Sequence, residues 1–310
     1  MNDFNNYAIK KVYFYIESKF WSKLDITILQ EWLSNFKTLE EKYCALKLLD
    51  RFVYYSEDDI IRLLDYGFNE KILKRQILKD EINNSFNCKN TSIMDKKKSF
   101  MEEILILPLI TDNVSESSPA MARHLTNDLG FPENRILDLN NLKSSDLNTA
   151  KRLIIIDDFI GTSNQIYTFW NETKIKIDGE EVFTNKLKSR FTNLEIEYFC
   201  LVCTEEGFEN FNIDNNALGS TGLKITYCEM LSKKFKVFGE TSVYFNKKEV
   251  EICKNIIESL CSKNNIELLG YKSLDYAIAF HHSIPDSSLP LFFKKRDSWN
   301  PLFKNKNTHN

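Results

Sequence analysis

The sequence has no long apolar run. In its 310 residues, no stretch approaches the roughly eighteen uncharged apolar residues of a membrane-spanning helix. The N-terminal segment MNDFNNYAIKK lacks the charged start, apolar middle and small-residue cleavage site of a signal peptide. We therefore expect a cytoplasmic protein with no membrane contact.

The chain also lacks a strong net charge and a cysteine framework. Its formal net charge is -3, so binding to nucleic acid would need a local basic patch. The seven cysteines are an odd, scattered set, unlike the paired cysteines of a small secreted domain. Cys200 and Cys203 form a CxxC inside the apolar run EIEYFCLVCTE, with no second pair at zinc-finger spacing. We expect both to be core residues.

Residues 1–84 have the apolar spacing of helices. Apolar residues recur every three or four positions in YAIKKVYFYIESKFW, ITILQEWLSNF and KYCALKLLDRFVYY. Thr38 with Glu41, and more weakly Ser56 with Asp59, match the capping-box pattern of a helix start. We predict a helical N-terminal domain, winged-helix-like in one interpretation, followed by a polar linker over residues 85–99.

A basic segment of this half, KILKRQILK, raises the question of DNA contact. Helical domains read DNA through basic faces, but acidic residues lie close by in the sequence, and a solvated face is the alternative.

Residues 100–310 alternate between strand and helix patterns. The apolar runs ILILPLI, RILDL, RLIIIDDF, EIEYFCLVC and LKITYCEML are separated by helical segments such as SPAMARHLTNDLG and NQIYTFWNE. This rhythm predicts an α/β domain with a mostly parallel sheet flanked by helices. Ligands bind outside the carboxyl ends of the strands in such sheets.

The stretch LIIIDDFIGTSNQ (Leu153 to Gln165) is the main candidate for chemistry. Asp157 and Asp158 are expected at the end of its strand, where water, a metal ion or ligand hydroxyls would satisfy two adjacent carboxylates. The small polar loop that follows enters a helix, whose N-terminus could hold a phosphate. The pattern predicts a ribose-phosphate site, with a plain helix cap as the alternative.

This motif resembles the phosphoribosyl-diphosphate binding motif of type I phosphoribosyltransferases. The resemblance implies that Asp157 and Asp158 hold the ribose hydroxyls and Mg²⁺. The residues it assigns to the 5′-phosphate are Gly161, Thr162, Ser163, Asn164 and Gln165. Ser163 stands where the family normally has glycine, which adopts positive φ more freely.

The wider layout resembles phosphoribosyltransferase-like proteins of bacterial conflict systems, including effectors encoded beside some retron reverse transcriptases. In those relatives, a C-terminal segment reads His, Pro, two Asn and Thr, then Leu-Pro. Here it contains His282, Pro285, Asp286 and two serines, so both amides are absent. The resemblance implies a toxin-like antiphage effector, with a reverse transcriptase and its noncoding RNA–DNA product as partners.

Other side chains are weaker candidates. Ser115, Ser117 and Ser118 follow the first strand, where they could donate to a diphosphate, with Arg123 pairing to it; an ordinary helix start is the alternative. His281 or His282 could act as a general acid or base, or pin its loop. Trp299 and Phe303 are expected to pack the tail rather than stack on a base.

Three functions remain open from the sequence. The first is an enzyme acting on a phosphoribosyl or nucleotide substrate, with Mg²⁺ as cofactor. The second is a nucleotide sensor that has kept the pocket without turnover. The third is a DNA-binding regulator with a nucleotide effector. Fold alone does not separate them.

Overall fold

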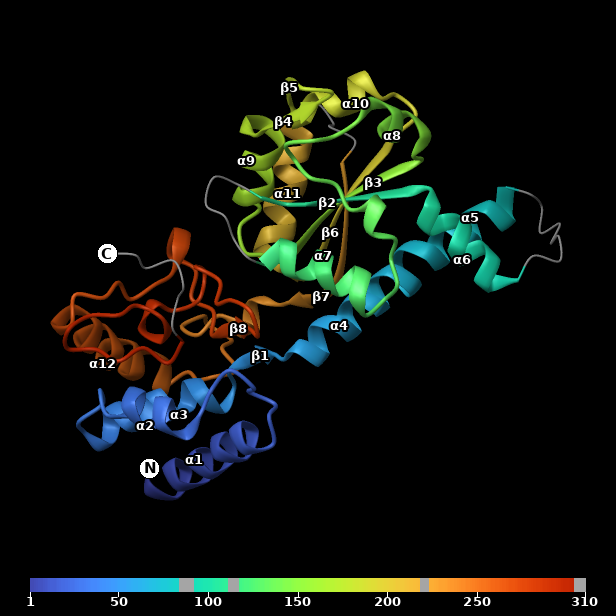
Figure 1. The fold of residues 1–310 in the computed structure, drawn as a ribbon. Helices are drawn as coiled ribbons and strands as arrows, with labels where there is room; N and C mark the ends of the chain where they lie inside the picture. The colour runs from blue at the N-terminus through green and yellow to red at the C-terminus, as the bar shows by residue number, and fades with distance from the viewer. Residues whose placement is uncertain (84–91, 111–116, 218–222, 304–310) are drawn as a thin grey trace. The chain divides into compact units, whose positions relative to one another are not determined.

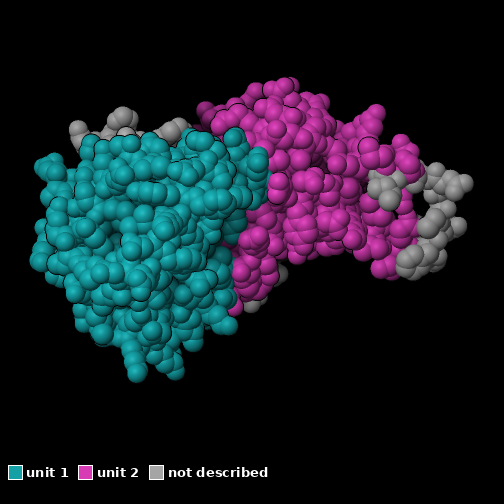
Figure 2. Space-filling model, turned by 90° about the horizontal axis from the view of Figure 1, so that it is seen from below, with its two compact units in different colours: residues 1–59, 231–310 teal, residues 60–230 magenta. Residues whose placement is uncertain are grey.

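The computed structural model describes residues 1–83, 92–110, 117–217 and 223–303. The chain forms two compact units, one built from residues 1–59 and 231–310 and the other from residues 60–230 (Figure 2). The division therefore lies elsewhere than the predicted boundary at residue 84, because residues from the far end of the chain pack with the N-terminal helices. No helix in the described ranges is long and apolar enough to cross a membrane.

The first unit is mainly helical. Its helices are α1 (Asn2–Glu17), α2 (Ile26–Leu33), α3 (Leu39–Asp50) and α12 (Glu249–Lys263), and its two strands, β1 (Val53–Tyr55) and β8 (Ile278–Phe280), pair in parallel. The predicted capping box at Thr38 is confirmed, with Glu41 N donating to Thr38 Oγ1 over 3.1 Å. The helical pattern expected through Tyr55 is wrong after Asp50, because the next aromatic and β-branched residues pair with β8.

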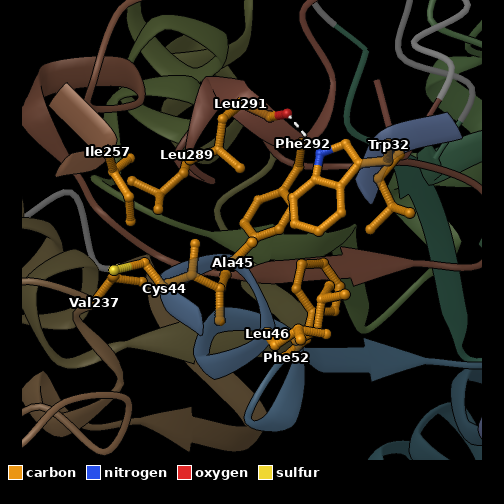
Figure 3. Close-up of a cluster of buried hydrophobic side chains, with 14 of the residues drawn as sticks. Trp32, Cys44, Ala45, Leu46, Phe52, Val237, Ile257, Leu289, Leu291 and Phe292 are labelled. Carbon is orange, nitrogen blue, oxygen red and sulfur yellow. Dashed lines mark hydrogen bonds between the residues drawn. The ribbon is translucent and has the colours of Figure 1, made fainter. Parts of the chain in front are cut away.

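Both ends of the chain contribute to the core of this unit. Trp32 and Trp299 are buried, and the two indole N–H groups donate to the same carbonyl, that of Leu291, over 3.1 and 3.0 Å. The Trp32 ring stacks on Phe292 with centroids 5.6 Å apart (Figure 3). Trp299 and Phe303 thus pack the tail, as predicted.

The second unit contains the predicted α/β sheet (Figure 1). Its strands are β2 (Ile104–Pro108), β3 (Arg152–Ile160), β6 (Glu195–Thr204) and β7 (Lys224–Leu231), hydrogen-bonded in the order β2-β3-β6-β7. β3 is parallel to both β2 and β6, which confirms a mostly parallel sheet. The expected strand RILDL forms only an isolated parallel bridge, from Ile136 to Ile106.

Helices cover both faces of the sheet (Figure 1). After α4 (Glu57–Tyr66), which crosses the division between the units, the elements are π-helical η1 (Gly67–Leu73), α5 (Lys74–Asn83), α6 (Ile93–Glu102), α7 (Ser117–Asn127), α8 (Ser144–Thr149), α9 (Asn164–Glu172), the antiparallel hairpin β4 (Lys174–Ile177) and β5 (Glu180–Phe183), α10 (Leu187–Arg190) and α11 (Glu205–Ala217). Part of the segment predicted as a linker is therefore helix α6.

Successive side chains of each strand point to opposite faces of the sheet. Ile155 and Tyr198 share a core with α9 and α11. Phe199 points the other way and contacts Phe68 of η1, with ring centroids 5.3 Å apart. Each strand side chain therefore packs against the helices on one face of the sheet or on the other.

Candidate functional site

The chain reverses its winding direction between β2 and β3. Ile106 of β2 pairs with Ile154 of β3 on one side and with Ile136 on its other side. The chain thus leaves β2 in one direction and crosses back to form β3. A reversal of this kind opens a crevice at the carboxyl ends of the two strands, where ligands of open α/β sheets bind.

Asp157 lies at this point, but its carboxylate is already held by the protein. Its Oδ1 accepts hydrogen bonds from the Asp158 N–H over 2.9 Å and from Ser118 Oγ over 3.2 Å, and its Oδ2 accepts one from the Tyr198 hydroxyl over 3.0 Å. Only 1% of Asp157 is exposed. Burial, and then the neighbouring Asp158 charge, raise the pKa of the Asp157 carboxyl well above its ordinary value.

Asp158 points to the opposite face of the sheet from Asp157. The two acids do not end the strand, because β3 continues to Ile160, and successive side chains of a strand alternate between faces. Asp158 retains 7% exposure against 1% for Asp157. Both acids are therefore buried, and Asp158 is the slightly more exposed residue.

The loop after β3 has the form that the motif predicted. Helix α9 begins at Asn164, as expected, and Ser163 at its N-cap position has a left-handed backbone with φ 65°. The Asn164 N–H donates to Thr162 Oγ1 over 3.4 Å, while Gly161 and Thr162 are partly exposed and Gln165 is exposed. The five predicted loop residues are thus brought together at the start of a nine-residue helix.

A neighbouring strand anchors this loop. The Thr204 hydroxyl at the end of β6 donates to the Gly161 carbonyl over 2.7 Å and accepts from the Gly207 N–H over 2.8 Å. A Cβ on Gly207 would lie 2.9 Å from the carbonyl oxygens of Ile160 and Gly161, so only glycine lets α11 approach so closely.

The N-terminus of α7 carries the serines that were predicted to contact a diphosphate. Ser117 and Ser118 are buried, and Ser118 reaches Asp157. Arg123 is exposed, almost two turns further along α7. Ser115 lies outside the described residues. The structure therefore brings Ser118 to Asp157, while the diphosphate contacts proposed for the serines and Arg123 stay predictions.

The predicted catalytic histidine belongs to the other unit. His282 follows β8, and its ring stacks on Phe280 with centroids 5.8 Å apart. Apart from its neighbour and alternative, His281, all other predicted site residues belong to residues 60–230. Its catalytic role remains a prediction.

The donors at the switch point fit Mg²⁺ through one carboxylate rather than two. Within the described ranges, no group of three or more acidic, histidine or cysteine side chains could hold a metal ion. Mg²⁺ is commonly held by one or two carboxylates together with substrate phosphates. Asp157, with three protein donors on its oxygens, does not fit as a ligand, so Asp158 is the carboxylate carried forward as the candidate.

Sequence reasoning missed Tyr198 and Thr204. Tyr198 lies opposite Ile155 in β6, so a known strand register would have placed its hydroxyl on the side of Asp157. Thr204 directly precedes EEG, the first residues of α11, and a threonine at that position is a signal for a helix cap. Neither could be tied to the motif without the pairing of β3 with β6.

The basic segment Lys71 to Lys79 is largely neutralised by partners. Lys74 pairs with Glu70 over 2.8 Å, Lys79 with Glu195 over 3.3 Å, and Arg75 holds both carboxylate oxygens of Glu197. These pairings do not favour the DNA-binding alternative.

Comparison with known proteins points to one family. The PRTase-CE family, where PRTase abbreviates phosphoribosyltransferase, matches residues 29–305. Among solved structures, orotate phosphoribosyltransferase from Aeropyrum pernix is similar at 13% identity with a TM-score of 0.24, over 43% of this chain and 62% of that chain. No curated protein matches the sequence.

Proposed function

This chain belongs to the PRTase-CE family, and on that premise we propose that it binds a phosphoribosyl ligand at the carboxyl ends of β2 and β3. What supports the proposal is the topological switch point beside β3, where Asp158 stands near the end of the strand and the loop of Gly161 to Gln165 follows it into α9.

Each part of the site has a distinct role in the proposal. Asp158 accepts hydrogen bonds from the ribose hydroxyls. The N–H groups at the start of α9 and the hydroxyl of Thr162 hold the 5′-phosphate, which the helix dipole favours. Asp157 positions these groups rather than touching the ligand, because Ser118 and Tyr198 already bind it.

Mg²⁺ would be held by Asp158 together with oxygens of the ligand. It would supply charge stabilisation for a departing diphosphate. Transfer of the ribosyl group would otherwise depend on how the protein positions the ligand. Thr204 and Gly207 hold the phosphate loop in place before the ligand binds.

The test is isothermal titration of phosphoribosyl diphosphate, and separately of NAD, with Mg²⁺. We expect Asp158→Asn to weaken binding about tenfold or more, the loss of a charge-assisted hydrogen bond. Asp157→Asn is the matched control and should change affinity only a few-fold. Equal losses in two variants that melt like the wild type would contradict the unequal roles, and no binding by the wild type would overturn the proposal.

A sensor without turnover is the second candidate. It is favoured by Ser163, because a side chain in left-handed backbone is retained where the related motif has glycine. Product analysis of the titration mixtures separates the candidates: a new product that disappears in Asp158→Asn indicates the enzyme, and binding without any product indicates the sensor.

We also propose a role in antiphage defence, which rests on the resemblance of the layout to conflict-system effectors. Plaque counts on cells carrying the wild-type gene with its neighbouring genes, against Asp158→Asn and Asp157→Asn versions, test it. Protection that depends on Asp158 is expected. Equal plaque counts with and without the wild-type gene, over a panel of phages, would contradict a defence role.

A further inference from the structure

A second cluster of polar side chains lies in the unit built from residues 1–59 and 231–310. Ser22 Oγ and His281 Nδ1 are 3.0 Å apart, which is hydrogen-bond distance. The other ring nitrogen of His281, Nε2, lies 3.8 Å from Glu57 Oε2. The three residues come from segments far apart in the chain, so no sequence motif marks them.

The parallel pairing of β1 with β8 explains how the cluster forms. The pairing matches Tyr55 with Phe280, so the residues after both strands emerge at the same end of the pair. The backbone N–H of His281 donates to the Tyr55 carbonyl over 2.8 Å. Because Tyr55 precedes Glu57 by two residues, this bond holds the histidine near Glu57. Ser22 reaches the ring from the connection between α1 and α2.

We propose that Ser22, His281 and Glu57 form a nucleophilic serine site that takes small activated acyl esters. A serine whose hydroxyl bonds to a histidine, with a third group orienting that histidine, is the arrangement by which a weak nucleophile is activated. His281 accepts the Ser22 proton at Nδ1. Glu57 is a positioning residue, since it faces the N–H at Nε2. The exposure of its side chain, 53%, lets it close the remaining distance.

The reaction balances with the groups present. Ser22 Oγ attacks the ester carbonyl carbon, a C–O bond forms, and the hydroxyl proton moves to His281 Nδ1. The bond from that carbon to the leaving alcohol then breaks, and the alcohol takes the proton from His281. Water attacks the resulting acyl-serine by the reverse route, which releases the acid and restores Ser22.

A tyrosine hydroxyl stands beside the nucleophile. Tyr54 OH lies close to the Ser22 side chain and accepts the Lys23 N–H over 3.2 Å. Burial raises the pKa of Tyr54, so the phenol keeps its proton at neutral pH. That proton can stabilise the oxyanion formed on attack.

The test uses the full chain and a fluorophosphonate probe. In labelling, the Ser22 oxygen bonds to phosphorus, the P–F bond breaks and fluoride leaves. We expect one label, mapped to Ser22 by peptide mass spectrometry, which is absent in Ser22→Ala and forms about 100-fold more slowly in His281→Gln. The same variants should lose hydrolysis of 4-nitrophenyl acetate, and Glu57→Gln should lower that kcat with a smaller change in KM.

The matched control lies beside the site. Ser56 bonds to Asp59 over 2.6 Å instead of to a histidine, so Ser56→Ala should label like the wild type. Labelling that is unchanged in Ser22→Ala, or no stronger in the native than in the heat-unfolded protein, would overturn the proposal. Should His281→Gln melt early, the position of the label on the wild type still decides.

Discussion

Ser163 shows at the residue scale how the phosphate loop departs from the related motif. Its φ of 65° lies in the left-handed region, where a side chain costs about 1 kcal/mol or more relative to glycine. The residue is also buried, so its conformation is held by the surrounding structure. The loop therefore keeps the shape of a glycine turn without the glycine.

We predict that Ser163→Gly is more stable than Ser163→Ala by about 1 kcal/mol, because alanine retains the Cβ that disfavours this backbone and glycine does not. Urea unfolding of both variants measures the difference. Equal free energies of unfolding for the two variants would mean that the loop relaxes out of the left-handed region.

Glu195 carries a pH dependence that can be measured. The hydrogen bond from Arg152, over 2.8 Å, is the main cause that lowers the pKa of the Glu195 carboxyl from 4.5 to about 2. A lowered folded-state pKa means that the unfolded chain binds the proton first as the pH falls. The stability that Glu195 contributes is therefore present above about pH 4.5 and is lost towards pH 2.

We predict that the stability difference between wild type and Glu195→Gln shrinks on going from pH 5 to pH 3. Solvent screens this half-exposed side chain, so the change is small. Urea unfolding at the two pH values measures it, with the exposed Glu172→Gln as control. A constant difference would show that the Arg152 pairing does not stabilise the folded state.

At the scale of elements, the phosphate loop depends on the junction of β6 with α11. Thr204 joins them through one hydroxyl, which satisfies both the Gly161 carbonyl and the Gly207 N–H. We predict that Thr204→Val costs about 1–3 kcal/mol, because both partners lose their bond, and weakens ligand binding. Thr204→Ser keeps the hydroxyl and should restore both properties.

Calorimetric melting and titration with phosphoribosyl diphosphate check this prediction. Loss of stability without loss of affinity would show that the loop is ordered by the ligand and not by Thr204.

At the scale of the whole molecule, the unit of residues 1–59 and 231–310 depends on its C-terminal aromatic residues. We predict that Trp299→Ala costs about 3–5 kcal/mol, since a side chain only 2% exposed leaves a cavity and the Leu291 carbonyl loses one donor. The exposed Ile252→Ala, in the same unit, should stay within about 0.5 kcal/mol of the wild type. Urea unfolding followed by circular dichroism measures both, and equal small effects would contradict this packing.

The sequence predicted local features well, because they depend on neighbouring residues. The strand of Arg152, the start of α9 at Asn164 and the capping box at Thr38 all follow from nearby pattern and chemistry. The division of the chain did not follow, since β1 reads as the end of a helix until its partner β8 is known. For the same reason, two of the three donors that occupy Asp157 could not be predicted, because Tyr198 and Ser118 reach it from other elements.

The unit of residues 1–59 and 231–310 is interrupted in the sequence by the other unit, and this affects its folding during synthesis on the ribosome. Residues 1–59 emerge first, but the partners of Trp32, the carbonyl of Leu291 and the ring of Phe292, emerge last. At about 5–20 residues per second, the N-terminal helices wait on the order of ten to thirty seconds while residues 60–230 are made. During that interval their apolar faces are open to chaperones, and a prematurely terminated chain would never cover them.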